Sequence, residues 1–228
     1  MDSVARQDGS VSSVGSTKGL VAELGLVCLL VGYGEFSIYR LILLLLLASQ
    51  SLWVRRLSWS HVGLRRPTSV SRTVLQAFVA ASIILVAVGF LIVPGAVWLT
   101  GVPVDLSALG EPRDVRALWL WLGQAWTLAA FGEEMVFRGY LIRRLSDLTG
   151  DGPIGRAIAL VISSALFGLA HRYQGWAGVI ATGTIGGILG LFYFVSRRNL
   201  WAVILCHALV DTVALSAIYF DRRSWLFP

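Results

Sequence analysis

The amino-acid sequence predicts an all-α fold, a polytopic transmembrane helical bundle with about seven membrane helices, in a range of about six to eight. Hydrophobic residues make up 56% of the 228 residues, and charged residues make up only 14%. The mean hydropathy is +0.74. Soluble proteins carry about 25% charged residues, so this composition is typical of a protein that crosses a membrane several times.

Apolar segments along the chain indicate where these helices lie. A membrane-spanning helix needs about 20 apolar residues, within a range of about 17 to 25. Residues 37 to 54 form one such segment, and residues 19 to 34 form a shorter one that carries Glu23. The shorter segment is either a short span or a helix at the membrane interface, and we favour a span. Five further segments meet the requirement or come close: 74 to 100, 115 to 137, 155 to 171, 176 to 195 and 199 to 219.

The loops between these segments differ in charge. The net charge is +6, and Lys18 is the only lysine. Residues 55 to 73 contain five arginines, whereas residues 101 to 114 contain one arginine and three acidic residues. The positive-inside rule places the first loop in the cytoplasm and the second outside. The same alternation assigns to the cytoplasm Arg143, Arg144, Arg156, Arg197 and Arg198.

This charge distribution also bears on localisation and partners. We expect an integral membrane protein, in the plasma membrane of a bacterium, with a cytoplasmic N-terminus and the lipid bilayer as its surroundings. Arginines grouped between apolar segments indicate membrane orientation. A nucleic-acid partner would need a soluble basic face, which the sequence lacks, so we expect none.

Four regions follow from these patterns. Residues 1–18 are rich in serine and glycine, lack the features of a secretory signal, and are expected to form a mobile tail. Residues 19–114 hold the N-terminal membrane helices and loops. Residues 115–219 form the helical core that carries the candidate site, and residues 220–228 form a C-terminal tail.

Two adjacent glutamates lie with an arginine inside the apolar segment from 115 to 137 and just beyond it. An ionisable side chain in the hydrocarbon region costs about 2.5 to 3.5 kcal/mol, so a functional role is the default hypothesis. Residues four apart share a helical face, so Glu134 and Arg138 are predicted to pair. Glu133 then turns to another neighbour and is the better candidate for a general base. The alternative is that the three residues only hold helices together.

Two of the three histidines favour a site over a structural role. His171 ends an apolar run, and His207 lies in another run with Asp211 four residues later. Asp211 therefore shares a helical face with His207, where a carboxylate can orient the imidazole and set its tautomer. His61 lies in an arginine-rich loop, and we assign it no catalytic role.

Small residues mark a second feature of the core. Four glycines between residues 176 and 195 form two overlapping GxxxG spacings, which allow a neighbouring helix to approach closely. We interpret them as packing residues, and a dimer face is the less favoured alternative. The glycines are Gly183, Gly186, Gly187 and Gly190.

Three motifs carry a resemblance to a known family. The sequence EEMVFR from Glu133 fits EExxxR, FGLAH from Phe167 fits FxxxH, and HALVD from His207 fits Hxxx(Asn/Asp). In this order, on successive membrane helices, they resemble the CPBP family of intramembrane proteases. This family is also called the CAAX-protease or Abi family, and it is related to the type II CAAX prenyl endopeptidases. The resemblance covers roughly residues 115 to 219.

The resemblance implies an intramembrane endopeptidase of the glutamic type, which forms no covalent intermediate. By motif position, Glu133 and His171 would activate a water, and His207 with Asp211 would stabilise the oxyanion. Many members have Asn in place of Asp211, and an ionised Asp cannot donate a hydrogen bond. We therefore expect Asp211 to orient His207.

The resemblance also bears on supporting residues, partners and cofactors. Glu134, Arg138 and Phe167 would support the site. The implied partner is a membrane-associated peptide or protein substrate, with prenylation left open, and the oligomeric state is not predicted. No cofactor is expected.

Alternatives remain beside this interpretation. A metal-dependent protease would use a zinc ion on Glu133, His171 and His207, although HExxH is absent and no thiolate site is indicated. A nucleophilic role for Cys206, beside His207, is less favoured. A non-catalytic bacteriocin-immunity or scaffold protein could keep the motifs for stability. A proton relay is disfavoured because no inverted repeat is visible.

The predicted topology creates a difference in depth. His171 lies at the outer end of its segment, Glu133 lies mid-helix, and His207 lies eight residues from an inner loop, so their depths differ by on the order of 10 Å. The difference shrinks if the helices around residues 138 to 160 extend further on the cytoplasmic side. The segment HRYQGW would then line a polar cavity. We expect that cavity to face the cytoplasm.

Overall fold

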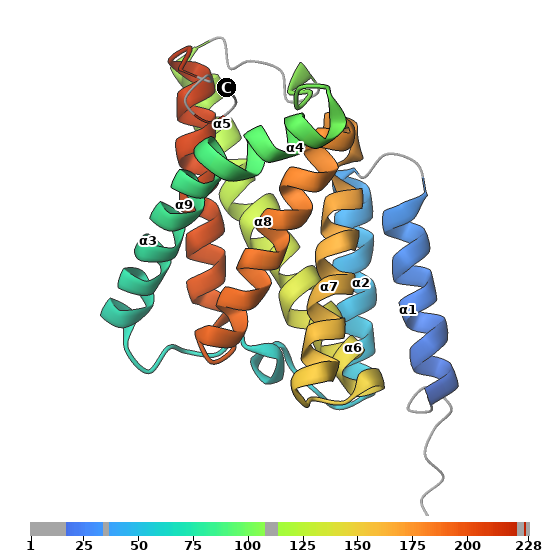
Figure 1. Ribbon diagram of the computed structural model, residues 1–228. Helices are drawn as coiled ribbons and strands as arrows, with labels where there is room; N and C mark the ends of the chain where they lie inside the picture. Colours follow the sequence, from blue (N-terminus) through green and yellow to red (C-terminus); the bar gives the residue numbers. More distant parts are fainter. Residues whose placement is uncertain (1–16, 34–36, 108–113, 223–225, 227–228) are drawn as a thin grey trace, which may run out of the picture.

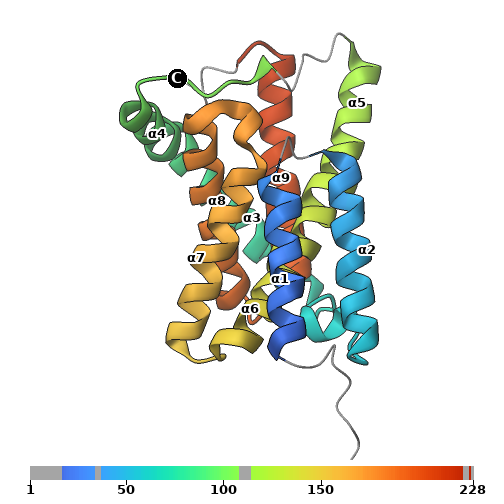
Figure 2. The same cartoon turned by 90° about the vertical axis from the view of Figure 1, so that its right-hand side faces the viewer.

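The computed structural model describes residues 17–33, 37–107, 114–222 and 226. Every regular element in these residues is a helix, and the helices pack side by side in one bundle (Figures 1 and 2). The predicted all-α fold class is therefore confirmed. Of the two predicted tails, residues 1–16 and most of 220–228 lie outside the described residues, whereas Thr17 and Lys18 belong to the first helix.

The α-helices follow one another along the described chain. They are α1 (Thr17–Gly32), α2 (Ile38–Val54), α3 (Val70–Ala87), α4 (Val93–Thr100), α5 (Val115–Gln124), α6 (Ile142–Thr149), α7 (Pro153–Ala170), α8 (Gly175–Val195) and α9 (Leu200–Tyr219). Two 3-10 turns are η2 (Trp59–Val62) and η7 (Arg172–Gln174). Three π-helical segments are η3 (Val88–Ile92), η5 (Ala125–Glu133) and η6 (Met135–Leu141).

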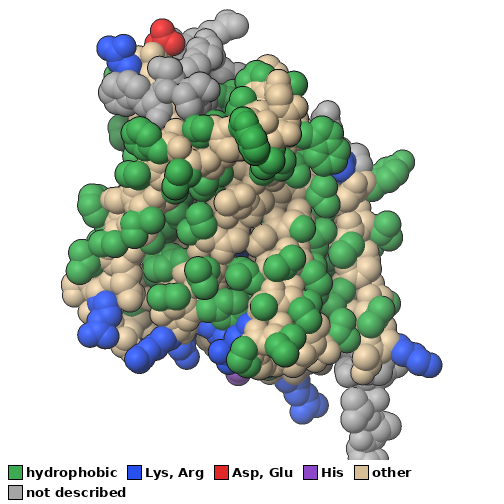
Figure 3. Space-filling view, viewed as in Figure 1, with side chains coloured by type: hydrophobic (Ala, Val, Ile, Leu, Met, Phe, Trp, Pro, Cys, Tyr) green, Lys and Arg blue, Asp and Glu red, His purple; other side chains and the backbone are tan. Residues whose placement is uncertain are grey.

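Several of these helices have the length and composition of membrane spans. Four stretches qualify: Val70–Thr100, Pro153–Ala170, Arg172–Val195 and Leu200–Tyr219. Helix α2 is apolar but shorter. Helix α1 runs alongside α2 and α7 in both views, as a span would, and does not lie across the end of the bundle (Figures 1 and 2). Hydrophobic side chains cover the flank of the molecule, and Lys and Arg gather at its lower end (Figure 3).

Local sequence explains where several helices begin. Ser69, Asp114 and Asn199 each accept a hydrogen bond from the backbone N–H three residues later, which caps α3, α5 and α9. Pro153 begins α7, where its missing N–H costs nothing. These caps set the ends of the elements that carry the candidate site.

The long stretch from Val70 to Thr100 bends near its middle. The π-helical segment η3 ends at Ile92, two residues before Pro94, and both features are known causes of kinks. Helix α4 consequently turns away from α3 and lies across the upper end of the bundle (Figure 1). This bend brings α4 against α8.

The arginine-rich loops meet at the lower end of the bundle. The N–H of Leu200 donates to the carbonyl of Gly63 at 3.1 Å, and the Tyr193 hydroxyl donates to the carbonyl of Val62 at 2.7 Å. Gly63 has φ of +105°, and a Cβ there would collide with the Arg198 carbonyl, so this position requires glycine. Arg198 in turn pairs with Asp151 in the loop between α6 and α7. The arginines predicted to share one side of the membrane therefore lie at one end.

A partly buried carboxylate joins the N-terminal helices to the rest of the bundle. Glu23 on α1 accepts hydrogen bonds from Ser51 and Arg55 on α2 and from the Tyr140 hydroxyl on η6. The Arg55 Nη2 to Glu23 Oε2 distance is 2.6 Å, and the two side chains are 13% and 12% exposed. Glu23, which lies in an apolar segment of the sequence, is thus paired.

Replacing Glu23 by alanine should destabilise the protein. The substitution removes the acceptor for three donors, and hydrogen bonds to a charged group are worth about 1.5 to 3 kcal/mol. We expect the free energy of unfolding to fall by about 2 to 3 kcal/mol, measured by circular dichroism in detergent. Glu23→Gln keeps an acceptor oxygen and should lose less. Equal unfolding midpoints for Glu23→Ala and the wild type would contradict this role.

Candidate active site

The two glutamates lie on a helix whose geometry differs from the predicted one. The chain is helical from Val115 to Thr149, but from Ala125 to Leu141 it is π-helical apart from Glu134, and we call this part the π-helical stretch. The i→i+5 hydrogen bonds of a π-helix are rare and are often found at functional sites. A neighbouring helix compensates for the altered backbone, since the Ser163 hydroxyl on α7 donates to the carbonyl of Phe137 at 3.0 Å.

Glu134 and Arg138 form the predicted ion pair. Arg138 Nη1 donates to Glu134 Oε1 at 2.8 Å, and the side chains are 1% and 0% exposed. Arg138 Nη2 donates to the carbonyl of Gly186 on α8 at 3.0 Å. The guanidinium also lies 4.3 Å from the ring centroid of Phe167 on α7, a cation–π contact. Arg138 therefore connects three helical segments.

His207 lies between two carboxylates. Its Nδ1 is 2.8 Å from Glu134 Oε1, the same oxygen that accepts from Arg138. Its Nε2 is 3.5 Å from Asp211 Oδ2 on the next turn of α9. The predicted pairing of His207 with Asp211 is confirmed as a contact. The contact with Glu134 was not predicted, because residues 73 positions apart show no local pattern.

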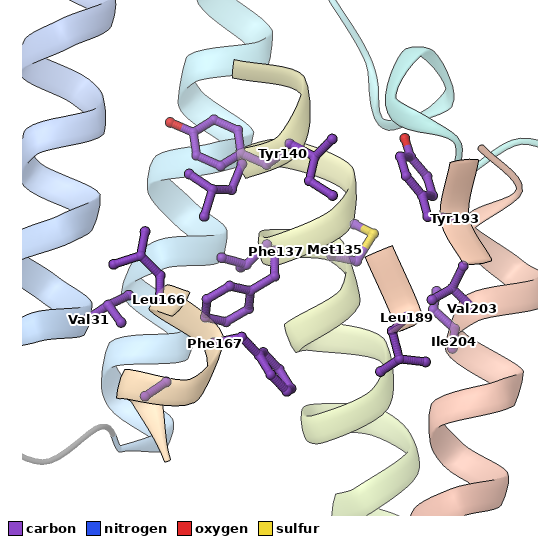
Figure 4. Close-up of a cluster of buried hydrophobic side chains, with 14 of the residues drawn as sticks. Val31, Met135, Phe137, Tyr140, Leu166, Phe167, Leu189, Tyr193, Val203 and Ile204 are labelled. Carbon is purple, nitrogen blue, oxygen red and sulfur yellow. The ribbon is translucent and has the colours of Figure 1, made fainter. Parts of the chain in front are cut away.

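His171 ends α7 and is held by Phe167 one turn earlier. Its Nδ1 lies 2.9 Å from the Phe167 carbonyl, which can only accept, so Nδ1 carries the proton. In the neutral ring, Nε2 then keeps its lone pair. The Phe167 ring is T-packed against Phe137 at 5.1 Å, and Figure 4 shows the two rings together.

Phe167 also lies next to both histidines. Its ring centroid lies 4.8 Å from that of His171 and 6.2 Å from that of His207. Both histidines therefore contact the same side chain, as expected if the helices around residues 138 to 160 extend further on the cytoplasmic side. Helix α6 carries the chain further toward the lower end before α7 begins, which lowers His171 along the bundle (Figure 1).

All four predicted catalytic residues line one cavity of about 710 Å³. They are Glu133, His171, His207 and Asp211. Glu133 is 8% exposed, and its Oε2 has no hydrogen-bond partner among the described residues. Glu134 and Arg138 do not line the cavity. The two adjacent glutamates thus have different surroundings: Glu133 lines the cavity, and Glu134 is fully buried away from it.

The cavity faces the upper end of the bundle, opposite to the arginine-rich loops. Much of its wall is apolar, and its polar lining includes Gln124, Tyr173 and Gln174. The described residues that line it include none from the loops at 55–66 or 196–200. The expected cytoplasmic-facing cavity therefore conflicts with the charge-derived orientation. The reason is that those two loops bond to each other and close the lower end.

The turn after His171 was predicted to line a cavity, and it does. Tyr173 and Gln174 in η7 both line it. Their individual roles could not be assigned from the sequence. The indole N–H of Trp126 donates to the Thr212 hydroxyl at 3.0 Å, which ties the π-helical stretch to α9 beside Asp211.

The zinc set considered from the sequence is not formed in this arrangement. Within the described residues, no three His, Cys, Asp or Glu side chains lie close enough to hold a metal ion. Both nitrogens of His207 face carboxylates, so neither is free for a cation. His171 Nε2 and Glu133 remain, which is fewer than the three protein ligands of a catalytic zinc site.

The four glycines of α8 pack the helix against its neighbours, as predicted. A Cβ at Gly183 or Gly187 would meet Ser164 on α7 at 3.4 Å, and a Cβ at Gly190 would collide with Leu160. Gly186 differs because its position lies at the candidate site. A Cβ there would lie 2.9 Å from Phe167 Cδ1 and 3.3 Å from Arg138 Nη2.

Gly186→Ala should therefore disturb the site, whereas Gly183→Ala should not. The Phe167 ring is enclosed by Phe137, Arg138 and His171 and has little room to move. We expect Gly186→Ala to lower the free energy of unfolding by about 1 to 3 kcal/mol, the usual range for overpacking. Thermal unfolding in detergent would measure it. Equal midpoints for the two variants would argue against a tightly packed Phe167.

A comparison with known protein families matches one part of the chain. Residues 115–213 match the family model Rce1-like, described as type II CAAX prenyl endopeptidase Rce1-like. The match begins at α5 and ends shortly after Asp211, so it contains all three motifs. No curated protein and no solved structure matches the chain. The predicted relationship is confirmed for this part of the chain: residues 115–213 of this membrane protein are similar to the Rce1-like CAAX-protease family.

Proposed function

We propose that the protein is an intramembrane endopeptidase that hydrolyses a peptide bond with a water activated by Glu133 and His171. The family match over residues 115–213 supports a CAAX-type protease in general. The observation that carries the mechanism is the convergence of Glu133, His171, His207 and Asp211 on one cavity. Residues from three separate helical segments would have no structural reason to share that surface.

The first step is attack of water on the substrate carbonyl. Glu133 takes a proton from the water, the resulting hydroxide oxygen bonds to the carbonyl carbon, and the C=O pair moves to oxygen as an oxyanion. The lone pair on His171 Nε2 accepts a hydrogen bond from the same water and orients it.

The second step breaks the peptide bond. The oxyanion pair re-forms C=O, the C–N bond breaks, and the leaving nitrogen takes the proton that Glu133 had accepted. The products are a carboxylic acid, which keeps the second proton of the water, and a free amine; transfer of that proton to the amine gives the carboxylate and the ammonium group. No covalent bond to the protein forms at any point.

His207 and its partners support both steps without reaching the water themselves. Glu134 holds the Nδ1 side of the ring and Asp211 faces the Nε2 side, so the imidazole has one orientation. A ring fixed in this way needs no rearrangement as charge develops beside it, which is the condition for electrostatic preorganisation.

The cavity also limits the substrate. Its wall above the four residues is apolar, with contributions from α3, α8 and α9. An apolar segment of a membrane-associated protein fits such a wall, whether or not it carries a prenyl group. Helix α1 begins at the arginine-rich end, which supports a cytoplasmic N-terminus (Figure 2). The substrate then enters from the opposite end or from the bilayer.

Glu133→Gln should abolish cleavage while leaving the fold intact. The amide keeps the shape but cannot take a proton, and general-base catalysis contributes roughly 10²- to 10⁴-fold. The purified protein would be reconstituted in liposomes with an internally quenched CAAX peptide, in farnesylated and unmodified forms. Asp147→Asn, at the lower end, is the matched carboxylate-to-amide control. Wild-type rates for Glu133→Gln with an unchanged unfolding midpoint would overturn the mechanism. Failure of the wild type on both peptides would favour the non-catalytic alternative.

Chelation separates the proposed mechanism from the metal-dependent alternative. If protein groups alone activate the water, EDTA should leave kcat and KM of the same cleavage within experimental error. The alternative predicts that EDTA removes activity and that added Zn²⁺ restores it. Restoration of activity by Zn²⁺ would contradict the metal-free mechanism, because a metal would then supply the activated water.

A further inference from the structure

Tyr173 shares the cavity with the four residues of the proposed site. It lies in η7, the turn between α7 and α8, and its side chain lines the cavity wall. Its ring centroid is 5.8 Å from that of His171, with the planes inclined by 35°. No motif in the sequence singles out this residue.

The proposed reaction needs a hydrogen-bond donor for the oxyanion, and the neighbouring groups offer few. Arg138 directs its terminal nitrogens at Glu134 and the Gly186 carbonyl. Asp211 is an acceptor when ionised. His171 uses its Nδ1 proton on the Phe167 carbonyl, and both ring nitrogens of His207 face carboxylates. The described side chains around Glu133 are therefore rich in acceptors and poor in free donors.

The Tyr173 hydroxyl has a proton to give. Gln174 Nε2 donates to the Tyr173 oxygen at 3.2 Å, which occupies one acceptor position of the hydroxyl. A phenol can accept and donate at once. Among the described residues no group accepts the Tyr173 proton, so it remains available to a ligand in the cavity.

The turn that carries Tyr173 is fixed from three sides. The Gln174 N–H donates to the His171 carbonyl at 2.9 Å, and the Asp105 N–H donates to the Gln174 carbonyl at 3.0 Å. Arg172 Nη1 donates to the Gly32 carbonyl at the end of α1, at 2.6 Å. A donor on such a turn needs no rearrangement as charge develops, which is the condition for strong oxyanion stabilisation.

We propose that Tyr173 is a further catalytic residue, whose hydroxyl donates a hydrogen bond to the oxyanion formed when water attacks the substrate carbonyl. The inference rests on the proposed function. Tyr173 forms no covalent bond and keeps its proton, so the two hydrolytic steps balance as before. Gln174 acts through Tyr173 as a positioning residue.

Tyr173→Phe tests the inference directly. Removing one oxyanion donor typically lowers kcat by roughly 10²- to 10³-fold. We expect that loss on whichever quenched CAAX peptide the wild type cleaves, with KM within about threefold, since the hydrogen bond forms with the transition state. Tyr193→Phe is the matched control, because its hydroxyl serves the lower end of the bundle, and its kcat should be that of the wild type.

The outcomes separate this inference from the proposed function. If Glu133→Gln is inactive while Tyr173→Phe keeps kcat within threefold, the role of Tyr173 is overturned and the proposed function stands. If Glu133→Gln is fully active, or the wild type cleaves neither peptide, both the role of Tyr173 and the proposed function are overturned.

Gln174→Met tests the positioning role of Gln174. This variant keeps the Tyr173 hydroxyl but removes the amide that orients it, so its kcat should fall less than the kcat of Tyr173→Phe. A larger fall for Gln174→Met would assign the effect to the structure of the turn. Unfolding midpoints of all variants would exclude a general loss of fold.

Discussion

The Glu134 carboxylate is the interaction on which the candidate site depends. One of its oxygens accepts from both Arg138 and His207, at 2.8 Å in each case. The carboxylate is fully buried, and breaking a buried pair leaves an uncompensated charge that costs far more than an exposed pair is worth. The π-helical stretch and α9 are therefore held in one relative position. Arg138 extends the same constraint to α8 through the Gly186 carbonyl.

Phe167 transmits that constraint to α7. Its ring contacts the Arg138 guanidinium and also lies next to the rings of His171 and His207. Its carbonyl selects the tautomer of His171. A single residue thus sets both the position and the chemical state of the histidine beside the proposed base. Gly186 has no side chain because Phe167 and Arg138 fill the space that one would need.

The parts of this arrangement that are local could be predicted from the sequence. Glu134 and Arg138 are four residues apart, and so are His207 and Asp211, and both pairs form. The contact between Glu134 and His207 could not be predicted, because it depends on how two helices pack. The π-helical geometry also depends on another helix, through Ser163.

The end of the bundle at which the cavity lies could not be predicted for a different reason. Loop charges indicate which end of a bundle faces the cytoplasm. They do not indicate which end the loops close by bonding to one another, as the segments around Gly63 and Leu200 do. Tyr173 lay within the segment predicted to line the cavity, yet only the bond from Gln174 distinguishes its hydroxyl from that of any other tyrosine.

The two adjacent glutamates show how one interaction can serve both stability and the proposed chemistry. Each has an Oε2 without a hydrogen-bond partner among the described residues, so the unpartnered oxygen does not separate them. Access to the cavity separates the two glutamates, because Glu133 lines the cavity and Glu134 does not. A base that takes a proton from water needs contact with water and freedom from a bound cation. Arg138 satisfies Glu134 and leaves the neighbouring Glu133 at the cavity without such a partner. The pair that stabilises the bundle is therefore also what positions the proposed base.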